Sequence, residues 1–175
     1  MTEDPFAILK VPHDFDLTNA AIEAAYLRCI AAVHPDSAES GAADTEMARL
    51  NDARSILLKP ESRANALLDS LGGPSAKACP ELPPAYLLEI LEQSMEIEEE
   101  LASDPVAARP KWTAWANDER NKILAAVAPL FAQASPKEGK ILRDLRTGLN
   151  AWRYIERLLE RLDPGYDPNR NDFRD

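Results

Sequence analysis

The sequence has little glycine, few aromatic residues and no long apolar run. Of its 175 residues, 6 are glycine and 6% are aromatic, whereas 14 are proline. Each proline removes a backbone N–H donor, so prolines in such number predict breaks between helices, and few strands are expected. No apolar run approaches the roughly 18 residues that a membrane-spanning helix needs, so no membrane association is expected.

Cysteine is equally scarce. Cys29 and Cys79 stand 50 positions apart, and neither belongs to a Cys-x-x-Cys pair. Zinc fingers and dithiol redox sites need such pairs, so the sequence predicts no metal site, no cofactor and a reducing compartment. The acidic amino terminus has neither the apolar segment of a secretory signal nor the arginines of a transit peptide, and we expect a cytoplasmic protein.

Basic residues are outnumbered. The chain has 20 Lys and Arg against 30 Asp and Glu, a net charge of −10. Nucleic acids require clustered positive charge, so this composition excludes a general nucleic-acid binder and favours protein partners. Residues 81–104 hold 8 acidic and no basic residues, whereas 137–161 hold 7 basic and 4 acidic ones. We expect helices over these two segments to attract each other as neighbours.

A segment rich in proline and glycine divides the chain. Between residues 71 and 84, two glycines and four prolines prevent a continuous helix. The sequence therefore predicts two domains, over 1–72 and 84–163, with a linker over 73–83 and a polar tail over 164–175.

Apolar residues recur at helical spacing in both domains. The first domain is predicted to contain helices over 4–10, 17–33, a segment ending before Pro60, and 60–71. Asp16 or Thr18 is expected to cap the amino-terminal end of the helix over 17–33, and a polar loop is expected over 37–44. The second is predicted to contain helices over 85–103, 106–134 and 137–162, with Trp112, Trp115 and Trp152 in its core. Three such helices make an antiparallel bundle, so the predicted fold class is all-α.

The second predicted helix ends in His34-Pro35-Asp36, with Tyr26 eight residues earlier. This pattern resembles the second helix and loop of a J-domain. The matches to one J-protein family are Leu50-Asn51-Asp52-Ala53, Leu57, Pro60, Arg63-Ala64, Leu67-Leu68, Leu71-Gly72, Tyr86 to Glu92, and Trp152-Arg153-Tyr154-Ile155. Together they resemble HscB, the Jac-type co-chaperone of iron–sulfur cluster assembly, over positions 4–162.

The resemblance implies a J-domain, made of a helical hairpin with short flanking helices, that is joined to the bundle in an L shape. J-domains dock their His-Pro-Asp loop on a heat-shock chaperone ATPase, here one of HscA or DnaK type, and stimulate ATP hydrolysis. The residues implied to bind the chaperone are His34, Pro35, Asp36, Tyr26 and Arg28. The chaperone performs the hydrolysis, so the chain itself is not expected to be an enzyme.

The resemblance also implies a second surface. In HscB-like proteins the first bundle helix presents an apolar patch with flanking acids to an IscU-type scaffold protein. The matching positions are Leu87, Leu88, Leu91, Glu92 and Tyr154. Leucines at this spacing are also typical of a bundle core, and that alternative stays open.

One departure from the family concerns charge. J-domains usually carry several Lys or Arg on the second helix, but residues 17–33 contain only Arg28, balanced by Glu23. Arg54 stands where the family often has an aromatic residue. Electrostatic steering toward the chaperone is therefore expected to be weak.

Other functions stay open at this point. The chain could be a general J-protein, a purely structural helical protein or a small hydrolase, and in each case a monomer is expected. The hydrolase would use the acidic run Glu96, Glu98, Glu99 and Glu100. Adjacent helical residues point in different directions, and no nucleophile–base pair or metal-ligand spacing accompanies this run.

Overall fold

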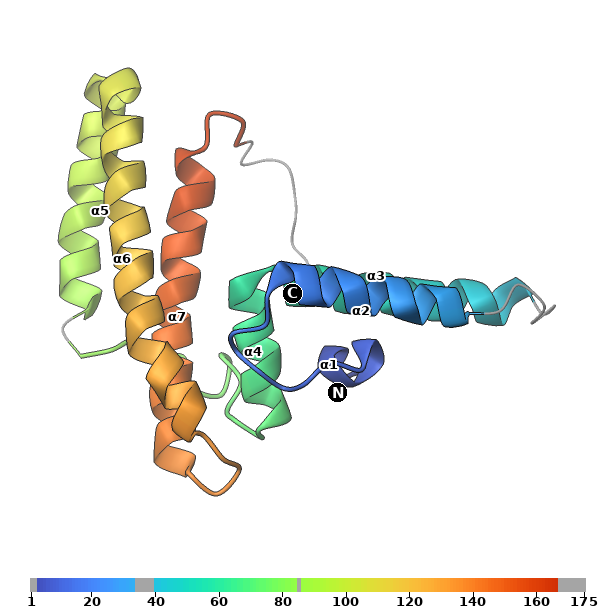
Figure 1. The fold of residues 1–175 in the computed structure, drawn as a ribbon. Coiled ribbons are helices and arrows are strands. Elements are labelled where there is room, and N and C mark those ends of the chain that lie inside the picture. The colour runs from blue at the N-terminus through green and yellow to red at the C-terminus, as the bar shows by residue number, and fades with distance from the viewer. Residues whose placement is uncertain (1–2, 34–39, 85, 167–175) are drawn as a thin grey trace. The chain divides into compact units, whose positions relative to one another are not determined.

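The computed structural model describes residues 3–33, 40–84 and 86–166, and all regular structure in these ranges is α-helical (Figure 1). The helices are α1 (Pro5–Leu9), α2 (Asn19–Ala32), α3 (Ser40–Leu58), α4 (Pro60–Ser70), α5 (Tyr86–Ser103), α6 (Pro105–Gln133) and α7 (Gly139–Leu162). The all-α prediction is confirmed, while the L-shaped arrangement stays a prediction. The chain forms two compact units, Met1–Pro74 with Ala134–Leu142, and Ser75–Gln133 with Arg143–Asp175.

Side-chain caps define the starts of the first two helices. The Asp4 carboxylate accepts from Phe6 N at 3.0 Å, and Pro5 occupies the first turn, where its missing donor costs nothing. Thr18, and not Asp16, caps α2, because its hydroxyl accepts from Ala21 N at 3.2 Å.

The first unit is organised around the long hairpin of α2 and α3 (Figure 1). Its buried apolar side chains are Phe6, Leu9, Ile22, Ala25, Leu50, Ala53, Leu57, Ala64, Leu67, Leu68 and Leu142. Arg63 is also buried, and its guanidinium donates to Leu57 O at 2.7 Å, where α3 ends and leaves a carbonyl without a helical partner. Burial lowers the pKa of Arg63 from its usual value, with Asp16 and Asp14 opposing the shift.

The predicted loop over 37–44 is wrong from residue 40 onward, because α3 begins at Ser40. Ala42 and Ala43 are strong helix formers, and they offset the cost of about 1 kcal/mol that Gly41 adds to a helix. Residues 37–39 lie outside the described residues. The start of α3 could not be found from polarity alone, since polar residues also occupy exposed helical turns.

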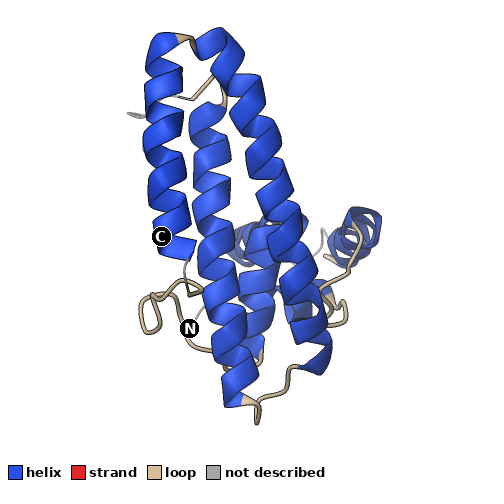
Figure 2. Ribbon diagram, turned by 90° about the vertical axis from the view of Figure 1, so that its left-hand side faces the viewer, coloured by secondary structure: helices blue, strands red, loops and turns tan. Residues whose placement is uncertain are grey.

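The second unit contains α5, α6 and most of α7, three long helices in which successive members are antiparallel (Figure 2). Its larger buried side chains are Ile90, Ile97, Trp112, Ile123, Val127, Phe131, Leu145, Leu149, Trp152, Ile155, Leu158 and Leu162. Trp115 is only half-buried and meets Trp112 edge-on at 5.7 Å between ring centroids. The first and third helices are parallel to each other, as contacts from Ser94 to Tyr154 and from Glu98 to Arg161 require.

Two further details concern the course of α6 and its packing against α7. Pro110 and Pro129 both lie inside α6, which continues through them, and Gln133 Nε2 donates to Pro129 O at 3.1 Å near the helix end. Gly148 lets α7 approach α6 closely, since a Cβ there would stand 2.7 Å from Val127 Cγ1. None of the described helices is both long enough and apolar enough to cross a membrane.

Candidate binding surfaces

The first surface centres on Tyr26, which is half-buried between α2 and α3. Its hydroxyl donates to Asn51 Oδ1, and the Arg54 guanidinium lies 5.0 Å from its ring centroid. Arg54 also makes a two-pronged ion pair with Glu23, with Nε 2.8 Å from Oε2 and Nη2 2.5 Å from Oε1. The hydrogen bonds from Arg54 lower the pKa of the Glu23 carboxyl. Tyr26 is thus held from α3 on one ring face and at its hydroxyl.

The structure gives Glu23 a partner from outside the residues 17–33 over which the charges were counted. Glu23 is paired with Arg54, so the two charges neutralise each other. Arg28 is exposed, and no ion pair found among the described residues involves it. Its neighbour Leu27 is 63% exposed. Over Asn19–Ala32, the part of α2 that the structure describes, the outer face therefore presents an apolar side chain beside one cation without an ion pair.

His34, Pro35 and Asp36 lie outside the described residues, and their role stays a prediction. The described helix stops immediately before them. α2 ends at Ala32, and Val33 takes an extended conformation with ψ 99°.

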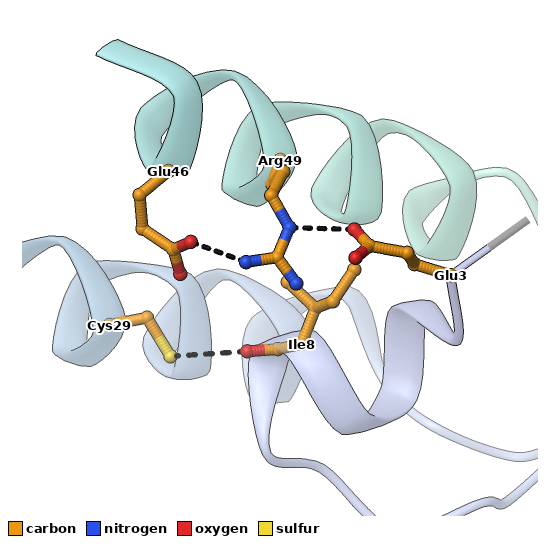
Figure 3. Close-up of polar contacts among 5 residues, drawn as sticks. All are labelled: Glu3, Ile8, Cys29, Glu46 and Arg49. Carbon is orange, nitrogen blue, oxygen red and sulfur yellow. Dashed lines mark hydrogen bonds and ion pairs between the residues drawn. The ribbon is translucent and has the colours of Figure 1, made fainter. Parts of the chain in front are cut away.

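Contacts behind α2 fix the amino-terminal segment against the hairpin (Figure 3). Arg49 of α3 donates from Nε to Glu3 at 2.6 Å and from Nη1 to Glu46 at 2.5 Å, and these bonds raise the pKa of Arg49. Cys29 is half-buried, and its thiol points to the carbonyl of Ile8 at 3.9 Å. Cys29 therefore helps to pack α1 against α2, as a small apolar side chain with a weak donor does.

The second surface lies on α5. Leu87, Leu88 and Leu91 are 55%, 68% and 53% exposed, whereas Ile90 and Ile97 face the core and are 4% and 2% exposed. The alternative that these three leucines form the bundle core is therefore wrong. Their exposure fits the predicted patch, and their binding role stays a prediction.

The remaining two predicted residues border this patch. Glu92 is exposed on α5. Tyr154 is half-buried on α7, and its hydroxyl shares a 2.6 Å hydrogen bond with Ser94 Oγ of α5. The fold thus brings Tyr154 into contact with Ser94 across a sequence separation of 60 residues, and Ser94 lies one helical turn beyond Leu91 on α5.

Two further residues of this region were not among the predicted site residues. Met95 is 73% exposed, one helical turn beyond Leu91. Tyr86 has a buried hydroxyl with no hydrogen-bond partner among the described residues, and burial raises its pKa well above the usual value. The exposure of Met95 could have been found only by knowing which side of α5 meets α6 and α7.

The acidic run of α5 forms pairs between helices. Lys111 of α6 lies 2.5 Å from Glu100 and 3.6 Å from Glu96, and Glu98 lies 3.5 Å from Arg161 of α7. The bond from Lys111 lowers the pKa of the Glu100 carboxyl. Within the described ranges, no group of three or more His, Cys, Asp or Glu side chains is placed to hold a metal ion. These carboxylates attach α5 to its neighbours, which gives no support to a hydrolytic centre.

Similarity to known proteins covers both surfaces. Residues 4–66 match the DnaJ domain family. Two relatives are co-chaperone HscB homologues. The protein from Burkholderia multivorans is 31% identical over 138 residues, which is 75% of this chain and 79% of the relative. The protein from Haemophilus ducreyi is 27% identical over 167 residues, which is 91% of this chain and 87% of the relative.

Solved structures show the same fold. The chaperone HscB from Vibrio cholerae aligns with a TM-score of 0.72 at 22% identity, covering 91% of this chain and 94% of that one. The human co-chaperone HscB aligns with a TM-score of 0.71 at 24% identity, covering 92% of this chain and 81% of that one.

Proposed function

Because this chain belongs to the HscB family of J-domain co-chaperones, which serve iron–sulfur cluster assembly, we propose that it joins two partners. It carries an IscU-type scaffold protein to an HscA- or DnaK-type chaperone and stimulates the chaperone ATPase, so that the cluster can be transferred. The observation that carries the scaffold half is the row of exposed leucines on α5. Outside α5, the leucines of the described residues are buried or half-buried, except Leu27. Leaving apolar side chains in water does not stabilise the fold, so the exposure of Leu87, Leu88 and Leu91 indicates an interaction surface.

The chaperone-binding half is assigned to residues 1–72. His34, Pro35 and Asp36 contact the chaperone, and Asp36 supplies a carboxylate for a charge-assisted bond with an arginine of the partner. Tyr26 and Arg28 extend this contact along α2. The pairs that join Tyr26 to Asn51 and Glu23 to Arg54 support the proposal, because they give the docking helix a fixed orientation on α3.

The scaffold-binding half is assigned to residues 84–163, after a linker over 73–83. Leu87, Leu88 and Leu91 supply the apolar contact, while Glu92 and Tyr154 border it. Burying exposed leucines in a complex gains roughly 25 cal/mol for each Å² removed from water. We assign the protein to the cytoplasm as a monomer that acts without a cofactor or an active site of its own.

A chaperone ATPase assay tests the whole proposal. Scaffold protein and this chain, added together, should stimulate ATP hydrolysis by more than the sum of their separate effects. His34→Gln should abolish stimulation while the circular dichroism spectrum stays unchanged. Additive rates, or full stimulation by the variant, would remove the chaperone assignment.

The scaffold contact is tested by combining Leu87→Ala with Leu91→Ala. Because both side chains are more than half exposed, the melting temperature should change little while scaffold binding falls at least tenfold. Unchanged binding would favour the alternative of a general J-protein, whose bundle recruits a different client. A pull-down of purified scaffold by the wild-type chain separates the two.

A further inference from the structure

The exposed residues of α5 form two stripes of different chemistry. One stripe is apolar and consists of Leu87, Leu88, Leu91 and Met95. The other is acidic and consists of Glu89, Glu92, Glu96 and Glu99. Leu87, Leu91 and Met95 follow steps of four, with Leu88 three positions before Leu91, and the acidic residues follow steps of three and four, so each set forms a continuous strip on the helix surface.

Contacts with the neighbouring helices orient these stripes. Ser94 and Glu98 bond to α7, and they share a row with Leu87 and Leu91 at steps of four, three and four. Glu96 instead contacts Lys111 of α6 and belongs to the acidic row. The apolar stripe therefore lies on the α7 side of α5, and the acidic stripe lies on the α6 side.

The α7 border of the apolar stripe is basic. Tyr154, Arg157 and Arg161 follow one another at steps of three and four, so they share a face of α7. The first bonds to Ser94 of α5 and the last to Glu98 of α5, which places Arg157 between two residues that contact α5. Arg157 is exposed, and no hydrogen bond or ion pair found among the described residues involves it.

The scaffold-facing surface thus has an apolar centre between rims of opposite charge, acidic on α5 and basic on α7. We propose that Arg157 is a specificity-determining residue that binds a carboxylate of the scaffold protein docked over Leu87, Leu88, Leu91 and Met95. This proposal rests on the proposed function. It assigns to the partner an apolar centre with an acidic group on the side that meets α7.

Opposite rims also set the orientation of the partner. A scaffold turned by half a revolution would place its acidic group against Glu92 and Glu99, where like charges repel. Guanidinium groups pair with carboxylates through a planar fork, so Arg157 can select an acidic group by geometry as well as by charge. Because the pair would lie at a rim, its contribution depends on ionic strength.

Binding of a purified IscU-type scaffold protein to the full-length chain tests this proposal. Arg157→Ala should weaken binding about fivefold and Arg157→Glu by more than about tenfold, with larger losses at low salt. Arg143→Glu is the matched control, since it makes the same charge change on the same helix, 14 residues or about 21 Å away. It should leave the affinity unchanged, and none of these variants should alter stimulation of the chaperone without scaffold.

Equal affinities for Arg157→Glu and Arg143→Glu would overturn the role of Arg157. If Leu87→Ala with Leu91→Ala still abolished binding in that case, the proposed scaffold function would stand without it. If the wild-type chain bound no scaffold, the proposed function itself would fail. Arg157→Gln, which keeps the length and polarity of the side chain, should lose affinity as Arg157→Ala does, while a melting curve checks that each variant folds.

Discussion

At the scale of single residues, Arg54 shows how a J-domain hairpin can be held without the aromatic residue that the family often has there. Its guanidinium stacks over the Tyr26 ring and pairs with Glu23, so one side chain supplies both an apolar contact and an ion pair. Tyr26 was found from its spacing to His34. The role predicted for Tyr26 stays a prediction, and the contacts of Arg54 could not be predicted because its pair with Glu23 joins positions 31 residues apart.

Replacing Glu23 with Gln tests this contact through pH. The pKa of Glu23 lies below its ordinary value of 4.5 in the folded chain, so the pair stabilises the fold above that value and is lost as pH falls through the folded pKa. Glu23→Gln should slightly lower the melting temperature at neutral pH, and this difference should shrink as pH falls below 4.5 and through the folded pKa. Thermal unfolding of both proteins at several pH values measures this, and an equal shift at every pH would contradict it.

At the scale of elements, α5 has a core face and an exposed apolar face that differ by one residue position. Ile90 is buried and the adjacent Leu91 is half-exposed, although both are large and apolar. Periodicity alone did not separate them, because apolar residues on α5 occur on both faces. The choice is made by α6 and α7, whose contacts determine which rows of the helix are covered.

Ile90→Ala and Leu91→Ala form a matched pair that tests these two faces. Loss of the buried side chain should cost about 2 to 4 kcal/mol in the free energy of unfolding, because it leaves a cavity. Loss of the exposed one should cost less than about 0.5 kcal/mol. Urea denaturation of the two variants measures both, and similar costs would mean that the leucine belongs to the core.

Most helices could be predicted because their apolar spacing and proline breaks are local properties of the chain. The limits of α4 and α7 differ from the sequence expectation by one or two residues, while α6 extends through Pro110 and Pro129. A proline in a helix costs one hydrogen bond, and the buried Trp112 and Val127 of α6 offset that loss with packing. Packing between distant segments could not be derived from the local sequence.

At the scale of the whole molecule, the proposed chaperone-binding face of α2 carries little positive charge. The pairing of Glu23 with Arg54 leaves Arg28 as the exposed cation of α2 among the described residues. Salt screens the attraction between exposed charges beyond about 10 Å at 0.1 M. Because charge contributes little to this encounter, its rate should depend only weakly on salt.

Stimulation of the chaperone ATPase should therefore change less than about twofold between about 50 and about 300 mM salt. Leu27→Lys, which adds a second cation to the exposed face of α2, should raise stimulation at low salt and make it salt-sensitive. Measurements of hydrolysis across this range test the prediction. A steep loss for the wild-type chain would show that other charges steer the encounter.

The apolar stripe of α5 also has a consequence for how copies of the protein behave together in solution. The exposed leucines and methionine of one copy could pack against the same residues of another copy. Each copy, however, carries a net charge of −10, so two copies repel each other. Mutual repulsion should oppose such contacts at neutral pH and leave the stripe accessible. Near the isoelectric point, about 4.7, this repulsion disappears. The exposed apolar stripe should then promote self-association and lower the solubility of the protein.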